Sequence, residues 1–236
     1  MKKMFHFISP LTYALFVKSF SLINTCPNNL IMIKIRKIHN INLSILSTVM
    51  LLGFTFANYK DNKIYPLHNL LCKPYSDDNI YAFIFSKLFL YSKYLEWFDS
   101  LFLHLSNKEI SQLQYTHHMS TAILVYVNSY TGIESYVYIP LSLNCFVHIF
   151  MYWYFAYPKG TLLKFRKIIT ISQIIQHLSV LYLAIYVRYL DNCKINNYAN
   201  ILTIALYLMY FYYFSMFYIV TYLKKKNNPK INIKYK

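Results

Sequence analysis

Long apolar stretches alternate with short polar segments along most of the chain. A helix that crosses a bilayer needs roughly 20 mostly apolar residues. The pattern predicts membrane helices at 5–24, 41–59, 80–105, 112–131, 135–157, 163–189 and 198–223. The first stretch is interrupted by Lys18 and also resembles a signal peptide, because Lys2 and Lys3 precede it. We interpret it as a membrane helix because no clear small-residue cleavage site follows.

Basic residues are divided unevenly between the two sets of loops, and this division predicts the orientation. Cytosolic loops of membrane proteins collect Lys and Arg. One side carries Lys34, Arg36, Lys37, Lys108, Lys159, Lys164, Arg166, Lys167 and the basic tail 224–236. The other side carries Lys2, Lys3, a charge-balanced loop at 60–79, Glu134, Asp191 and Lys194. The pattern therefore predicts a lumenal N-terminus and a cytosolic C-terminus on one all-α integral membrane domain, 1–236.

The composition favours a membrane protein over a soluble one. Of 236 residues, 57% are hydrophobic and 14% are charged, whereas soluble domains have about 25% charged residues. A net charge of +16 would suggest nucleic acid in a soluble protein. Here the basic residues flank apolar stretches, which instead favours membrane lipid and an anionic cytosolic ligand, with no nucleic-acid partner. The four cysteines form no CxxC pair, and a disulfide between Cys72 and Cys193 is left open.

Polar groups fall at similar depths in four predicted spans. Glu96 and Asp99 lie nine and six residues before the cytosolic end of 80–105. His117 and His118 lie one to two turns from the cytosolic end of 112–131, and His148 and Gln173 lie somewhat deeper in their spans. A rise of 1.5 Å per residue places them about 8–15 Å below the cytosolic boundary. Ionisable residues at membrane depth are costly and usually mark function. The sequence thus predicts a functional site in this layer.

Lys93, Glu96 and Asp99 follow one another at intervals of three residues, so we expect them to share one helix face. Pairing Glu96 with Lys93 lowers the cost of burying both. Two interpretations stay open: an acidic side of the site, or an internal ion-pair network. His118 is equally open to a supporting or a chemical role. Other polar and aromatic residues are interpreted as structural: His177 and His104 as hydrogen-bonded side chains, His6, His39 and His68 as exposed ones, and Tyr152, Tyr154 and 207–222 as packing residues.

Five segments resemble, in order, the motifs of the very-long-chain fatty acid elongase family. They are 92–100 (similar to SKxxExxDT), 114–118 (at the place of HxxHH), 147–155 (VHxxMYxYY), 170–176 (TxxQxxQ) and 217–222 (FYxxxY). The resemblance covers about 80–223, and 34–59 more loosely. Gln114 stands at the first box histidine, and an amide can hydrogen-bond but cannot carry a proton. Ser100 and Phe155 stand for Thr and Tyr.

The resemblance implies condensation of a long acyl-CoA with malonyl-CoA to a 3-ketoacyl-CoA, CO2 and CoA. It implies seven transmembrane helices, six of them forming a barrel around an acyl tunnel, in the endoplasmic reticulum. It implies no metal and no cofactor besides the CoA thioester substrates. The expected partners are the ketoacyl reductase, dehydratase and enoyl reductase of the elongation cycle, and a second copy in a homodimer.

The same resemblance suggests roles for individual residues. His117 and His148 would act on the thioester, with His118, Asp99 and Glu96 completing the catalytic group. A neutral imidazole can attack a thioester and can act as an acid or base near neutral pH. The expected substrate-binding residues are Lys93, Gln114, Asn144, Met151, Tyr152, Gln173 and Gln176, with Lys164, Arg166 and Lys167 toward the CoA phosphates.

Two other classes of function were weighed. A di-iron desaturase needs many histidine and carboxylate ligands, and only three membrane histidines cluster here. A seven-helix transporter or receptor without enzymatic activity would account for the apolar spans and the buried charges. It would not account for a histidine pair and a separate histidine at one depth.

Overall fold

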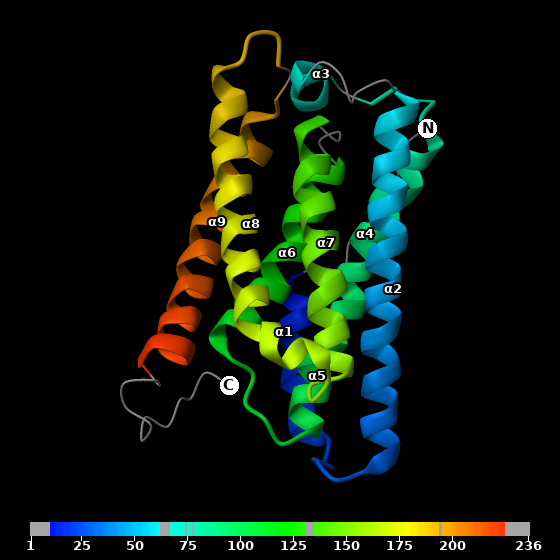
Figure 1. The fold of residues 1–236 in the computed structure, drawn as a ribbon, viewed down its shortest axis with the longest axis vertical. Helices are drawn as coiled ribbons and strands as arrows, with labels where there is room; N and C mark the ends of the chain where they lie inside the picture. Colours follow the sequence, from blue (N-terminus) through cyan, green and yellow to red (C-terminus); the bar gives the residue numbers. More distant parts are fainter. Residues whose placement is uncertain are drawn as a thin grey trace.

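The structure, a computed structural model, describes residues 10–61, 67–73, 75–76, 78–130, 135–193 and 195–224. Within these ranges all regular structure is helical, which confirms the all-α prediction (Figure 1). The elements are α1 (Pro10–Ser19), η1 (Phe20–Leu22), α2 (Leu30–Lys60), α3 (Leu67–Cys72), α4 (Ile80–Glu96), α5 (Phe98–Leu105), α6 (Gln112–Tyr130), η2 (Ser135–Val137), α7 (Tyr138–Ala156), η3 (Thr161–Phe165), α8 (Arg166–Tyr186), η4 (Val187–Tyr189), α9 (Asn197–Tyr218) and η5 (Ile219–Lys224).

The long helices run along the long axis of the molecule and alternate in direction (Figure 1). Helix α3 lies at one end, and the start of α2 lies at the other. Helix α2 packs along α7 and α4, while α9 packs on α8 and α6. The core between α2, α4 and α7 is aromatic, with Phe54, Phe89 and Tyr138 almost wholly buried. This packing holds α4, α6 and α7 around a common interior.

Four described helical segments are long and apolar enough to cross a membrane: α2, α7, Thr161–Tyr189 and Asn197–Leu223. The predicted count of seven spans is therefore not confirmed. Helix α1 and η1 together are shorter than the roughly 20 residues that a bilayer requires, although part of the predicted span 5–24 lies outside the described residues. Helix α6 has the length, but its first turns carry Gln112, Gln114 and the histidine pair.

Helix α2 begins at Leu30, well before the predicted start at residue 41. The side chain of Asn29 accepts hydrogen bonds from the backbone N–H groups of Ile31 and Met32, which caps the helix. Lys34, predicted to lie in a loop, is therefore helical and exposed. Basic side chains are compatible with a helix end because their heads remain in water while their stems cover apolar surface. The extension adds about three turns of helix, and it includes His39.

The predicted span 80–105 is two helices, separated at Trp97. The Trp97 N–H donates to the Tyr94 carbonyl and the Ser100 N–H donates to the Trp97 carbonyl, so the chain tightens into short i to i−3 bonds. The Trp97 indole N–H donates to the His118 carbonyl at 3.0 Å. Lys93 and Glu96 therefore lie on α4 and Asp99 lies on α5, so the single helix expected over 80–105 is two consecutive helices.

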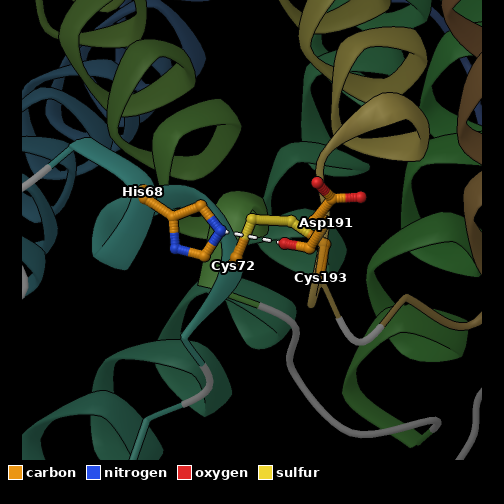
Figure 2. Close-up of a disulfide and its surroundings, with 4 residues drawn as sticks. All are labelled: His68, Cys72, Asp191 and Cys193. Carbon is orange, nitrogen blue, oxygen red and sulfur yellow. Dashed lines mark hydrogen bonds between the residues drawn. A yellow bond between two sulfur atoms is a disulfide. The ribbon is translucent and has the colours of Figure 1, made fainter.

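A disulfide joins Cys72 of α3 to Cys193 after η4, as Figure 2 shows. The sequence left this bond open. Beside it, His68 Nε2 lies 3.0 Å from the Asp191 carbonyl oxygen. Buried Tyr136 of η2 packs into the same cluster. The segment 60–79, predicted as a loop, therefore contains a short helix that is covalently tied to the segment between η4 and α9.

Tyr75 lies between α2 and α7 at this end. Its hydroxyl donates to Asn58, and its ring centroid is 4.0 Å from that of Tyr138. Burial raises the pKa of the Tyr75 phenol well above its usual range, and the nearby Tyr138 and Asp61 act in the same direction. The phenol therefore stays neutral over the whole physiological range.

Serine substitution of Cys72 or Cys193 should lower the free energy of unfolding by about 2–5 kcal/mol, because the bond constrains a long loop in the unfolded chain. The measurement is the thermal midpoint in detergent, with and without reductant. Cys26→Ser, at a free thiol, is the matched control and should behave as the wild-type protein. Alkylation of Cys72 in the unreduced protein would contradict this prediction.

Candidate active site

Four side chains from α4 and α7 form a closed polar ring in the protein interior. Lys93 Nζ donates to Glu96 Oε1 at 2.7 Å and to Asn144 Oδ1 at 2.9 Å. Asn144 Nδ2 lies 3.1 Å from His148 Nε2, and His148 Nδ1 lies 3.5 Å from the same Glu96 oxygen. Lys93 and Glu96 are 3% and 2% exposed. The predicted Lys93–Glu96 pair is thus present, and it is continuous with His148.

The ring fixes the proton positions on His148. An ammonium group only donates, so Asn144 must turn its oxygen to Lys93 and its NH2 to His148. His148 Nε2 is then the acceptor, and its proton lies on Nδ1, facing Glu96. In this arrangement the lone pair of His148 is already engaged, so the residue is held in place as a neutral imidazole.

Asp99 connects three helices near this ring. One carboxylate oxygen lies 3.1 Å from His39 Nε2 on α2, and the other accepts from the Tyr152 hydroxyl on α7 at 2.9 Å. The rings of Tyr152 and His148 are edge to face at 5.3 Å. His39, predicted to be exposed, has a side chain that is only 16% exposed. That prediction is wrong because α2 begins early enough to place His39 inside the helix bundle.

The two box histidines face different surroundings. His118 is buried against Tyr13 of α1, and its Nδ1 has no hydrogen-bond partner within the described ranges. His117 lies on the other side of α6, with ring centroids 5.1 Å from Tyr210 and 5.8 Å from Phe214. No hydrogen bond to the His117 ring is found among the described residues. Adjacent positions on a helix point in different directions. His118 therefore packs against α1, whereas His117 packs against α9.

His177 of α8 differs from its predicted hydrogen-bonded state. It is 3% exposed, and neither ring nitrogen has a hydrogen-bond partner in the described part of the chain. Its neighbours are aromatic: Tyr207, Tyr210 and Phe214 of α9 and His117 of α6. Phenyl and phenol rings present mainly apolar surface, which explains why this packing leaves the imidazole without partners.

The remaining predicted residues divide into an inner and an outer group. Gln173 Nε2 donates to Met151 Sδ at 3.2 Å, which joins α8 to α7, and Gln176 is buried one turn further on. Gln114 is half-buried in the first turn of α6. Three basic residues lie exposed at the start of α8 or just before it: Lys164, Arg166 and Lys167. The Lys167 ammonium lies 5.6 Å from the centre of the Tyr218 ring.

A mostly apolar cavity begins at the polar ring. Lys93 and Asn144 line one end, and Tyr136 and Asn128 line the other. Between them the wall is largely apolar: Phe89, Leu124, Val125, Val137, Pro140 and Leu141. On α4, α6 and α7 the lining spans about two helical turns, or roughly 10 Å. The free space inside it is about 60 Å³, below the roughly 300–1,000 Å³ that is usual for small-molecule sites.

These features define a helical protein of membrane type, with a buried site of one ion pair and several histidines beside an apolar cavity. Residues 2–230 match the sequence model of the ELO: GNS1/SUR4 family. The chain belongs to this family, which agrees with the elongase resemblance of its five motifs.

Curated relatives agree with the family assignment. The chain is 37% identical over 141 residues to fatty acid elongase A of Dictyostelium discoideum, covering 58% of this chain and 50% of that protein. It is 29% identical over 179 residues to fatty acid elongase sre1 of the same organism, covering 74% and 66%. Fatty acid elongase 2 of Trypanosoma brucei brucei is 28% identical over 156 residues, covering 61% and 57%. The chain therefore spans about half to two thirds of the length of these relatives.

Lys93→Met should destabilise the protein by about 3–5 kcal/mol, because it leaves Glu96 charged and unpaired in the interior. Glu96→Gln should be similarly harmful. The double variant should recover part of the loss, since no lone buried charge remains. Unfolding in detergent measures all three, and Lys34→Met at an exposed site of α2 is the control. Additive losses in the double variant would show that the two residues do not act as a pair.

Proposed function

We propose that this chain is a fatty acid elongase that condenses an acyl-CoA with malonyl-CoA to a 3-ketoacyl-CoA, releasing CO2 and CoA. The observation that carries the proposal is the polar ring of Lys93, Glu96, Asn144 and His148 at the mouth of an apolar cavity. Membership of a family whose curated relatives are called fatty acid elongases supports it. The ring offers polar contacts for a thioester, and the cavity offers an apolar space for an acyl chain.

His117 is the nucleophile that the geometry favours. The lone pair of His148 is engaged by Asn144, whereas the described contacts of the His117 ring are aromatic. His117 attacks the thioester carbon, the C–S bond breaks, and its electron pair leaves with sulfur. The proton lost from the imidazole neutralises the thiolate to CoA. An acylated imidazole remains, which is a good acyl donor.

The second half-reaction forms the new carbon–carbon bond. Malonyl-CoA loses CO2, and the electron pair of the broken C–C bond becomes a carbanion. This carbanion attacks the acyl carbon, the C–N bond breaks with its electron pair going to His117, and His117 takes up one proton from solvent to return to the neutral imidazole. Asn144 and Lys93 each carry a further N–H that can hydrogen-bond the enolate oxygen, and Glu96 and His148 hold them in place. Water-poor surroundings protect the acyl intermediate from hydrolysis.

The membrane arrangement is part of the proposal. Seven spanning helices, six of them around the acyl cavity, would sit in the endoplasmic reticulum with the basic ends in the cytosol. The exposed cations Lys164, Arg166 and Lys167 then face the CoA phosphates. The reductases and the dehydratase of the elongation cycle would take up the product, and no metal or further cofactor takes part in the steps above.

Membranes containing the protein should convert acyl-CoA and labelled malonyl-CoA to 3-ketoacyl-CoA. His117→Ala and His148→Ala should each reduce product by at least about 100-fold, since each removes a group from the reacting centre. Product is measured by mass spectrometry per folded molecule. His104→Ala, at a half-buried histidine bonded to the Ile23 carbonyl, is the control. Absence of product from the wild-type protein would refute the proposed activity.

Acyl-CoA alone should release about one equivalent of CoA in a burst, because the covalent step precedes malonyl-CoA binding. The rate is followed by thiol detection in a rapid-quench experiment. Steady-state kinetics should be ping-pong. If condensation proceeds without any burst and no acylated histidine can be trapped, a direct Claisen condensation with histidine as base replaces the covalent route.

A further inference from the structure

His177 is a buried polar group that the proposed mechanism leaves unused. It lies on α8, directly after Gln176, and its side chain points into the interior shared with α6 and α9. Its ring is 3% exposed. Buried polar groups are hydrogen-bonded in most structures, and an exception in a native protein calls for an explanation. A phenyl ring would pack against Tyr207, Tyr210 and Phe214 without this cost.

The position of His177 beside His117 supplies such an explanation. The two ring centroids are 6.4 Å apart at an interplanar angle of 64°. At that separation the ring nitrogens are too far apart for a direct hydrogen bond, because an N–H···N contact brings the rings closer. The gap is short enough for a single bridging group to reach both rings. Both imidazoles also contact Tyr210 and Phe214, so the packing of α9 fixes their relative placement.

We propose that His177 donates a hydrogen bond to the thioester carbonyl oxygen while His117 attacks the neighbouring carbon. This inference rests on the proposed condensing function. It assigns a role to a residue that lies outside the five motif segments. As the bond from His117 forms, the carbonyl electron pair moves to oxygen, and the His177 N–H stabilises the resulting oxyanion. When the C–S bond breaks, the carbonyl re-forms and His177 returns unchanged.

The substrate therefore completes the hydrogen bonding of an imidazole that the folded chain leaves unpartnered. Donors that are fixed in advance, in a site without water, stabilise developing negative charge most strongly. The interaction is stronger in the transition state than in the bound substrate, so its loss should appear in kcat rather than in KM. A packing role for the same ring would not produce this division.

Two substitutions separate hydrogen bonding from packing. His177→Phe keeps a flat ring among Tyr207, Tyr210 and Phe214 but has no donor. His177→Gln keeps an N–H donor at a similar reach. We expect His177→Phe to lower kcat about 10²–10³-fold, the usual loss for one oxyanion donor, with KM for acyl-CoA little changed. His177→Gln should retain at least about tenfold more activity than His177→Phe.

The controls make each outcome decisive. Leu178→Ala, at an exposed neighbouring position on the same helix, should leave kcat unchanged, and thermal midpoints of all variants are measured alongside. A wild-type kcat in His177→Phe would overturn the assignment and leave the condensing function standing. Equal losses in His177→Phe and His177→Gln would also overturn it. An inactive wild-type protein would refute the proposed function itself, and this inference with it.

Discussion

A charged pair buried among apolar helices must satisfy almost every donor and acceptor that it carries, or its desolvation cost dominates. Lys93 and Glu96 meet part of this demand through two residues of another helix, while Glu96 Oε2 has no hydrogen-bond partner among the described residues. The ammonium group fixes the Asn144 amide, and the amide in turn fixes the proton of His148. The position of α7 relative to α4 and the state of its histidine therefore follow from one ion pair.

A second set of contacts, made by Asp99 after the tight turn at Trp97, also holds α7 in place. Asp99 lies beyond this turn, on α5, and bonds to His39 and Tyr152. Each carboxylate has its own partners, and Asp99 ties α2 and α7 to the short helix α5. Contacts of Asp99 thus join α2, α5 and α7, and they do not involve Lys93.

Sequence patterns were enough for much of this picture, and the reasons for their failures are specific. The interval of three residues located the Lys93–Glu96 pair, and the chain order of the motifs located His148 and Gln173. The burial of His39 was not predicted, because the basic residues before it suggested a loop. In the structure α2 already begins after the Asn29 cap. The single helix expected over 80–105 was wrong because the chain tightens at Trp97. The partners of His177 depend on how α8 and α9 pack, which spacing along one helix does not encode.

The covalent link between Cys72 and Cys193 encloses α4, α5, α6, α7 and α8 in one loop, with a sequence separation of 121 residues. Every residue of the polar ring and of the histidine pair lies between these two cysteines. During synthesis, the second thiol emerges only after all of these helices have been made. The bond therefore forms late, and its formation marks the completion of the part of the chain that holds the site.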